Sequence, residues 1–363
     1  MLEVGLIVNP ISGMGGSVGL KGTDGNTYKK AIELGAKQVT PQRVKATLSL
    51  IKRNDIYLLV APGKMGEDYI KKFNFKYKVV GKIGEKTSAE DTKRIAKEMM
   101  KRAINLLIFF GGDGTARDIY DAIGISVPVV AIPSGVKMFS SVFALSPYAA
   151  AKMIDSYTEK SIEKEVLDID EDAFRNNKLA ATLYGYLKVP EIEALLQEGK
   201  EPSIMSKPEK ENKEEVAKYI VENMEKDILY ILGPGTTVKG ITDELDVDKT
   251  LLGIDSVYNK ELVGKDLNEK GLMELIKKYK KIKIIVTPIG GNGFIFGRGS
   301  KQITPEVLRL VGENNIIIVS TPGKISKLEC LRVDTGDAEV DRRLRKFVKV
   351  VTGCNEETVI EVK

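Results

Sequence analysis

The sequence of 363 residues contains no histidine and no tryptophan, and it contains only two cysteines. Without histidine, catalysis by a Ser-His-Asp or Cys-His arrangement is excluded, and so is a histidine-ligated metal site. Acid–base chemistry must therefore come from Asp, Glu, Lys or Tyr. Cys330 and Cys354 are too few for a disulfide framework or a four-cysteine zinc site, and they indicate a reducing, cytoplasmic location.

Long apolar segments are also missing. No stretch approaches the roughly 20 residues that span a bilayer, and the segment Met1–Val8 lacks the basic start and apolar core of a signal peptide. We therefore expect a soluble intracellular protein without a membrane partner. The net charge of +5 is small, and no dense basic cluster with interleaved aromatic residues is present, so we expect no nucleic-acid partner.

The first half of the chain alternates short apolar segments with helical patterns. We predict strands at Val4–Val8, Ile56–Ala61, Tyr77–Val80, Leu106–Phe110 and Val127–Ile132. We predict helices at about Gln42–Lys52, Met65–Lys72, Ala89–Lys101 and Ala116–Ile123. This alternation favours an open parallel α/β sheet covered on both faces. Ligands in such folds bind beyond the carboxyl ends of the strands.

From about Ser161 the pattern changes. We predict further strands at Val166–Ile169, Leu179–Leu187, Ile228–Leu232, Lys283–Val286 and Ile316–Val319, and a helix at Pro305–Val311. The charged stretch Glu198–Glu215 predicts an exposed loop leading into a helix. We expect an α/β domain at residues 1–150 and a second, β-rich domain with an inserted α/β segment at residues 160–335. We expect a C-terminal segment at residues 336–363 that returns to the first domain.

The most informative motif is Gly111–Gly112–Asp113–Gly114–Thr115, which joins a predicted strand to a predicted helix. Glycine lets the backbone approach a ligand closely, and the N–H groups at a helix start favour an anion such as phosphate. Asp113 would stand beside those phosphates and accept a proton from an attacking hydroxyl. The motif predicts phosphoryl transfer. The alternative is a tight turn in which Asp113 only accepts hydrogen bonds from backbone N–H groups.

Four more glycine-rich loops follow predicted strands. Their candidate phosphate-binding residues are Asn9, Pro10, Gly13, Gly15 and Gly16, continuing to Lys21 and Asp24; Ser134, Gly135 and Lys137; Gly233, Gly235, Thr236 and Thr237; and Gly290, Gly291 and Asn292. Backbone N–H groups would bind phosphate, with the two lysines as cations. Each loop alone could equally be a surface turn, but ordinary turns rarely need so many glycines together.

Two common nucleotide-binding signatures are absent. There is no Gly-x4-Gly-Lys-Ser/Thr sequence, and the nearest approach to Gly-x-Gly-x-x-Gly has Val18 in place of the third glycine. At the glycine loops the chain instead resembles the NAD kinase/diacylglycerol kinase superfamily. Asn9–Pro10 with its glycine-rich continuation and the turn at Gly111–Thr115 carry this resemblance.

The resemblance extends to the divergent NAD-kinase-like branch that includes acetoin-catabolism protein X. The segments that carry it are Lys21–Gly25, Pro133–Met138, Leu183–Leu187, Gly233–Thr237, Thr287–Gly291 and Val333–Gly336. It implies an N-terminal α/β domain, a β-rich second domain and an active site in the cleft between them. It also implies a homo-oligomer, a dimer or a tetramer.

The resemblance further implies roles for single residues. Asp113 would activate the 2′-hydroxyl of the adenosine ribose of NAD, Gly111, Gly112, Gly114 and Thr115 would cradle phosphates, and Gly235–Thr237 would bind the nucleotide from the second domain. The implied reaction makes NADP from NAD with ATP or polyphosphate as donor. It requires Mg²⁺ or another divalent cation, held largely by phosphates and not by protein ligands.

The sequence departs from the family at two places that bear on the substrate. The family's Gly-Ser-Thr-Ala-Tyr segment appears only as the altered Gly235–Thr236–Thr237. The Asn-Glu/Asp pair that holds the dinucleotide has no match, because the corresponding region reads Leu183–Tyr184–Gly185–Tyr186. Two alternatives therefore stay open. One is a kinase of another hydroxyl, such as a polyol or lipid headgroup, and the other is a non-catalytic nucleotide-binding regulatory protein.

Overall fold

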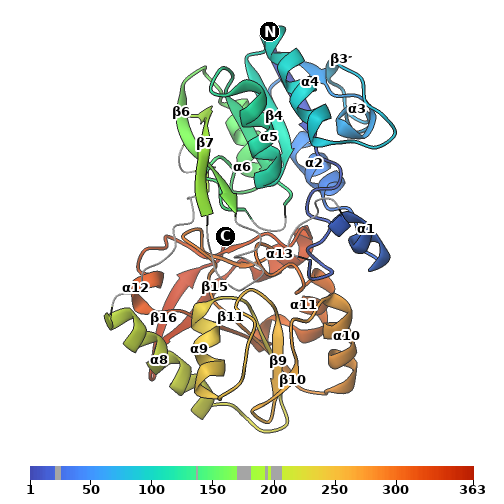
Figure 1. Cartoon of the computed structure of the whole chain (residues 1–363). Coiled ribbons are helices and arrows are strands. Elements are labelled where there is room, and N and C mark those ends of the chain that lie inside the picture. The colour runs from blue at the N-terminus through green and yellow to red at the C-terminus, as the bar shows by residue number, and fades with distance from the viewer. Residues whose placement is uncertain (21–25, 136–137, 170–180, 193–194, 198–206) are drawn as a thin grey trace.

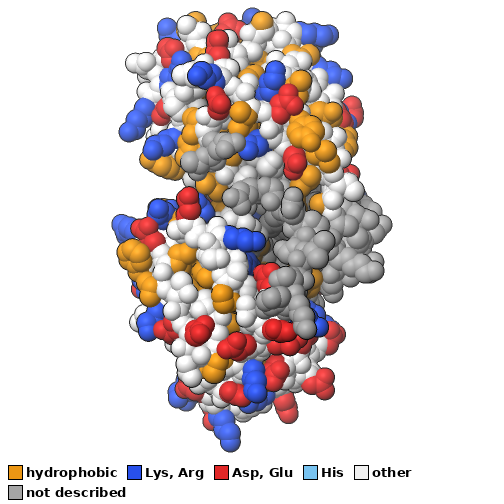
Figure 2. Space-filling view, turned by 90° about the vertical axis from the view of Figure 1, so that its left-hand side faces the viewer, with side chains coloured by type: hydrophobic (Ala, Val, Ile, Leu, Met, Phe, Trp, Pro, Cys, Tyr) orange, Lys and Arg blue, Asp and Glu red, His pale blue; other side chains and the backbone are white. Residues whose placement is uncertain are grey.

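The computed structural model describes residues 1–20, 26–135, 138–169, 181–192, 195–197 and 207–363. Two sheet-containing parts lie one above the other along the long axis of the molecule (Figure 1). Figure 2 shows basic and acidic side chains mixed over both parts on one face, with an indentation between them. Within the described ranges, no helix is both long and apolar enough to cross a membrane.

The first part contains a five-stranded parallel sheet with the order β3-β2-β1-β4-β5. Its strands are β1 (Leu2–Val8), β2 (Ile56–Val60), β3 (Lys76–Val79), β4 (Leu106–Gly111) and β5 (Val129–Pro133). Its helices are α1 (Asn26–Glu33), α2 (Thr40–Leu48), α3 (Glu67–Ile70), α4 (Ala89–Lys101), α5 (Asp113–Ile123) and α6 (Pro147–Asp155), with a 3-10 turn η1 (Gly63–Met65). Every residue of β4 and β5 is buried, because helices cover both faces of the sheet.

The predicted strands of this sheet are confirmed, with ends that differ by at most two residues. The strand predicted from Val127 starts at Val129, because Pro128 has no N–H to contribute to the sheet. The helix predicted at Met65–Lys72 is wrong in extent. Gly66 has an extended φ of 168°, which separates η1 from the short α3.

The second part contains a seven-stranded mixed sheet with the order β10-β9-β8-β11-β13-β15-β16. Its strands are β8 (Leu229–Leu232), β9 (Asp255–Tyr258), β10 (Glu261–Gly264), β11 (Ile282–Val286), β13 (Ile316–Val319), β15 (Phe347–Gly353) and β16 (Glu356–Glu361). Its helices are α8 (Lys207–Glu222), α9 (Thr236–Glu244), α10 (Glu269–Lys278), α11 (Pro305–Val311), α12 (Pro322–Ile325) and α13 (Ala338–Leu344), with a 3-10 turn η3 (Glu313–Asn315). A separate parallel pair is formed by β12 (Phe294–Phe296) and β14 (Arg332–Val333).

Residues of β8 alternate between two apolar clusters. Leu229 and Ile231 pack in one cluster, and Tyr230 and Leu232 pack in the other. Since successive side chains of a strand point to opposite faces, the second sheet is also covered on both sides. The predicted helix Pro305–Val311 and strand Ile316–Val319 are confirmed with the same ends.

The expected domain limits need two corrections. The hairpin of β6 (Ser161–Ile169) and β7 (Ala181–Pro190) belongs to the first part, because its buried Val166, Leu187 and Val189 pack into the core of that part. The C-terminal segment 336–363 does not return to the first part. It supplies β15 and β16, and β15 pairs with β13 in the second sheet.

Two predicted segments lie partly outside the described residues. The start of the strand predicted at Leu179–Leu187 falls there, and so do residues 198–206 of the predicted charged loop. Where the charged segment is described, from Lys207 onward, it is helical and forms α8.

Candidate active site

Three of the predicted glycine loops lie side by side at the carboxyl ends of β1, β4 and β5. The Asn9 amide Nδ2 donates to Thr115 Oγ1 at 3.0 Å. The backbone N–H groups of Ser134 and Gly135 donate to the Gly111 carbonyl at 2.9 and 3.2 Å. These three loops therefore lie at one edge of the sheet, where ligands bind in folds of this kind.

The loop of Gly13 and the loop of Gly112 both approach the loop of Ser134 and Gly135 so closely that a side chain would not fit between them. Gly13 has a φ of 78°, and a Cβ added there would lie 1.8 Å from the Ser134 carbonyl oxygen. A Cβ on Gly112 would lie 3.2 Å from the Gly135 Cα. Pro10, Gly13, Gly15 and Gly16 are all buried in this loop. Lys21, Asp24 and Lys137 lie outside the described residues.

Asp113 lies in the first turn of α5 and is 7% exposed. Its carboxylate accepts the backbone N–H of Phe139 at 2.8 Å, the N–H of Ser140 at 3.0 Å and the Ser140 hydroxyl at 2.5 Å. Asp113 thus ties α5 to the segment after β5. A substrate hydroxyl that approaches this carboxylate has to compete with those donors. No side chain caps α5 at Gly112, which suits the anion-binding role predicted for its N-terminus.

The two loops predicted in the second part also lie next to each other, because β8 and β11 are parallel neighbours. Gly235 precedes α9 with a φ of 115°, and a Cβ there would lie 2.8 Å from Thr287 Cγ2. No side chain caps α9. The Gly235 N–H donates to the Leu251 carbonyl at 2.9 Å, and the adjoining Leu252 packs against the cluster that Phe139 and Leu167 of the first part form.

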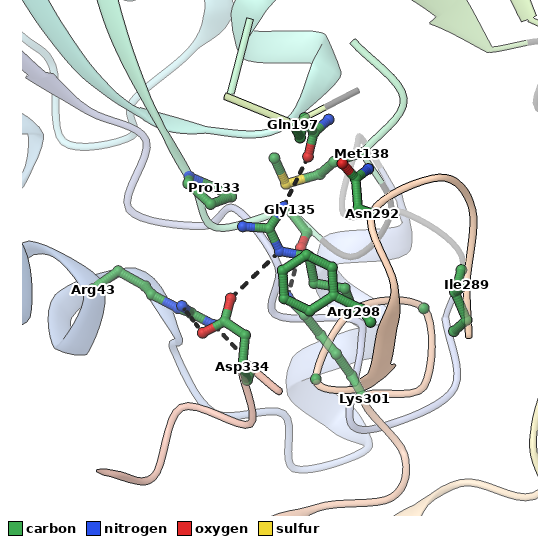
Figure 3. A pocket seen from close by; sticks show the side chains of 13 residues that line it. Arg43, Pro133, Gly135, Met138, Gln197, Ile289, Asn292, Arg298, Lys301 and Asp334 are labelled. Atoms are coloured by element: carbon green, nitrogen blue, oxygen red, sulfur yellow. Dashed lines mark hydrogen bonds and ion pairs between the residues drawn. The ribbon is translucent and has the colours of Figure 1, made fainter. Parts of the chain in front are cut away.

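A pocket opens between the two parts, with a cavity volume of about 30 Å³ (Figure 3). Of the predicted residues, Gly135 and Asn292 line it, whereas the other described candidates, Asp113 and Ser134 among them, do not. Sequence reasoning missed the four charged residues of its lining, which are Arg43, Arg298, Lys301 and Asp334.

The two arginines of the pocket share one carboxylate. Arg43 of α2 forms an ion pair with one carboxylate oxygen of Asp334, and Arg298 forms an ion pair with the other oxygen at 3.4 Å, as Figure 3 shows. Arg298 also donates to Gln197 Oε1 at 2.8 Å and to the Leu145 carbonyl at 2.6 Å. Burial lowers the pKa of Arg298 to about 10, although Asp334 opposes this shift.

Lys301 has no carboxylate partner among the described residues. Its Nζ donates to the carbonyl oxygens of Gly135 at 2.5 Å and Ser134 at 3.4 Å. Burial, together with repulsion from Arg43 and Arg298, lowers the pKa of Lys301 to about 7, and Asp334 offsets this only in part.

Two residues of this charged pocket, Arg298 and Asp334, lie in segments that the sequence marks as unusual. Arg298 lies between two glycines of positive φ, Gly297 and Gly299, and Asp334 lies in the segment Val333–Gly336 that carries the family resemblance. A Cβ on Gly297 would lie 1.9 Å from the Asp334 carbonyl oxygen, so this glycine permits the contact. Nothing in the sequence indicates that Arg43 lines a pocket, since it is one basic residue within an amphipathic helix.

The described residues contain no group of three or more Cys, Asp or Glu side chains placed to hold a metal ion. Asp113 and Asp334 are the carboxylates at the site, and each already accepts from protein donors. A divalent cation here would take most of its ligands from substrate phosphates and water, which is how Mg²⁺ commonly binds at phosphoryl-transfer sites.

Comparison with known families gives two matches that follow the two parts. Residues 4–162 match the sequence model of the ATP-NAD kinase N-terminal domain, and residues 225–362 match that of the ATP-NAD kinase C-terminal domain. No curated protein and no solved structure gives a significant match. The likeness to the acetoin-catabolism branch stays a prediction. With both domains present in order, the chain belongs to the NAD kinase-like superfamily.

Proposed function

We propose that this kinase-like phosphotransferase makes NADP, by moving a phosphoryl group from ATP or polyphosphate to the 2′-hydroxyl of the adenosine ribose of NAD. The observation that carries the proposal is the meeting of three glycine loops, with Asp113 among them, beside a cation-lined pocket between the two family domains. Phosphoryl transfer depends mainly on positioning and on charge stabilisation. Such a site can provide both.

The chain's own groups suit distinct roles. The uncapped N-termini of α5 and α9 offer backbone N–H groups to phosphate oxygens. Asp113 would accept the proton of the acceptor hydroxyl once a substrate displaces one of its present donors. Mg²⁺ would neutralise charge on the donor phosphates.

One observation favours a different acceptor. At the place where the family resemblance puts the dinucleotide-binding pair, β7 carries Tyr184, which is 39% exposed and donates its hydroxyl to Asp121 of α5 at 2.9 Å. Nothing in that contact resembles the missing Asn-Glu/Asp pair. A polyol or a lipid headgroup would not need such a pair, and we keep a kinase of one of these hydroxyls as the second candidate.

The function is tested by incubating the purified protein with NAD, Mg²⁺ and either ATP or polyphosphate, and measuring NADP by chromatography. NADP should form, and chelation of the cation should stop it. Tight NAD binding without NADP from either donor would instead indicate a regulatory protein. Phosphorylation of a polyol or lipid headgroup, with no binding of NAD, would establish the second candidate.

Hydrogen exchange tests whether the loops act as one site. Because the Asn9, Gly111 and Ser134 loops touch one another, added NAD should protect their backbone amides together. The Gly235 loop should join them if the nucleotide bridges the two parts. At about 100 times Kd the free energy of unfolding should rise by roughly 2.7 kcal/mol. Protection of a single loop would show that the others are only turns.

A further inference from the structure

Lys301 extends from the second part over the glycine loops of the first. A Cβ added to Gly16 would lie 2.6 Å from Lys301 Cδ, and one added to Gly13 would lie 3.3 Å from its Nζ. The Nζ donates to the carbonyls of Ser134 and Gly135, and Figure 3 shows the side chain directed at Gly135. The ammonium group therefore lies where the loops after β1 and β5 meet.

The pocket around Lys301 carries more positive than negative charge. Arg43, Arg298 and Lys301 face the single carboxylate Asp334, and both arginines already pair with it. The ammonium group of Lys301, which has three N–H donors, donates hydrogen bonds to two carbonyl oxygens. Lys301 is half-buried, and a cation withdrawn from water without a counter-ion is unfavourable, in agreement with its pKa, which is lowered to about 7. An anion in the pocket would remove the cost.

A buried hydroxyl group without a partner lies close to Lys301. The Ser134 hydroxyl is buried at 1% exposure and has no hydrogen-bond partner among the described residues. Buried hydroxyls without a partner are uncommon and unfavourable. Ser134 does not itself line the pocket, although its neighbours Pro133 and Gly135 do, and its carbonyl oxygen accepts a hydrogen bond from Lys301. The cavity has room for about two water molecules, which suits a small oxyanion and not a whole nucleotide.

We propose that Lys301 binds one phosphate group at the junction of the two parts, with Arg43 and Arg298 adding positive charge. The inference rests on the proposed function in one respect, that the phosphate comes from the phosphoryl donor or from the pyrophosphate of NAD. Binding itself needs no turnover. Because Lys301 belongs to the second part and Arg43 to the first, the bound phosphate would also hold the two parts together.

The binding test uses isothermal titration with inorganic tripolyphosphate alone and, separately, with NAD alone. Replacing Lys301 by methionine removes a charged hydrogen bond, so the affinity for the bound anion should fall roughly tenfold or more. The control is Lys327→Met, which removes an exposed lysine of the same part and should change neither affinity. A loss with tripolyphosphate assigns the site to the donor, and a loss only with NAD assigns it to the acceptor. Unchanged binding of both would overturn the proposal.

The pH dependence of sulfate binding gives a readout that a purely structural lysine would not produce. Sulfate keeps its charge between about pH 6 and about pH 8. The other charged groups facing Lys301 are Arg43, Arg298 and Asp334. Because the Lys301 cation is lost as the pH rises through about 7, affinity should fall roughly tenfold across this range. Lys301→Arg should bind at both pH values, since arginine stays charged, and Lys301→Met should bind weakly at both.

An equal pH dependence in the wild type and in Lys301→Met would refute the site, provided that thermal melts show both proteins folded. Failure of this inference can be told from failure of the proposed function. Lysine-dependent anion binding without NADP formation would reject only the proposed reaction. NADP formation with unaltered anion binding in Lys301→Met would reject only the phosphate site.

Discussion

Replacing Asp113 by asparagine is expected to lower the rate of phosphoryl transfer on the order of 10²- to 10⁴-fold while leaving nucleotide affinity nearly unchanged. Asp113 is the carboxylate within the glycine turn, at the start of α5 and beside the loops after β1 and β5. Asparagine has nearly the same shape but cannot take up the proton of the acceptor hydroxyl. Steady-state kinetics with the substrate pair identified by the NADP assay give both quantities.

The same substitution has a structural consequence that must be measured beside the rate. Asp113 accepts the N–H groups of Phe139 and Ser140 and the Ser140 hydroxyl. Asparagine offers one oxygen and one NH2 group, so a donor would face a donor at one of these contacts. We expect the free energy of unfolding to fall by about 1–3 kcal/mol, as measured by urea denaturation.

Asp121→Asn is the matched control, because it makes the same chemical change on the same helix at a more exposed position that pairs with Lys93 and Tyr184. Its turnover should equal that of the wild type. Wild-type turnover in Asp113→Asn would show that Asp113 is not the base. If affinity and turnover fell together, Asp113 would act by holding the segment at Phe139 and Ser140 in place.

The first sheet could be predicted because its signals are local. Four of its five strands are short apolar runs bounded by Gly, Pro or Asn, whereas β3 carries two lysines. The helix Ala89–Lys101 has a capping box at Ser88 and Asp91 that marks its start. The meeting of the Asn9, Gly111 and Ser134 loops follows from one further rule, that parallel strands place their carboxyl ends at the same edge. No contact between distant segments had to be known.

The charged pocket could not be predicted in the same way. Arg43 and Asp334 are 291 residues apart, and single charged residues in a chain with 29% charged residues carry no local signal of burial. The two errors in the domain limits have the same origin. The apolar residues of β6 and β7 could face either core, and the pairing of β15 with β13 is a long-range contact. Periodicity reports which residues become buried but not which partner covers them.

Loss of the Asp334 side chain should destabilise the protein strongly. Its carboxylate is the shared counter-ion of Arg43 and Arg298, and the side chains of Arg43 and Asp334 are only 8% and 9% exposed. Asp334→Ala would leave two buried guanidinium groups without their carboxylate. Removing one partner of a buried ion pair typically costs about 3–5 kcal/mol, so the free energy of unfolding should fall by about that amount in urea denaturation.

Asp248→Ala serves as the control, because Asp248 also pairs with a basic residue, Lys265, but its side chain is 83% exposed. Exposed pairs contribute little to stability, so this variant should unfold at nearly the wild-type urea concentration. Adding Arg43→Met to Asp334→Ala removes one of the stranded cations and should recover part of the lost stability. If Asp334→Ala destabilised the protein no more than the control, the two arginines would be adequately solvated without it. The junction between the two parts would then not depend on this carboxylate.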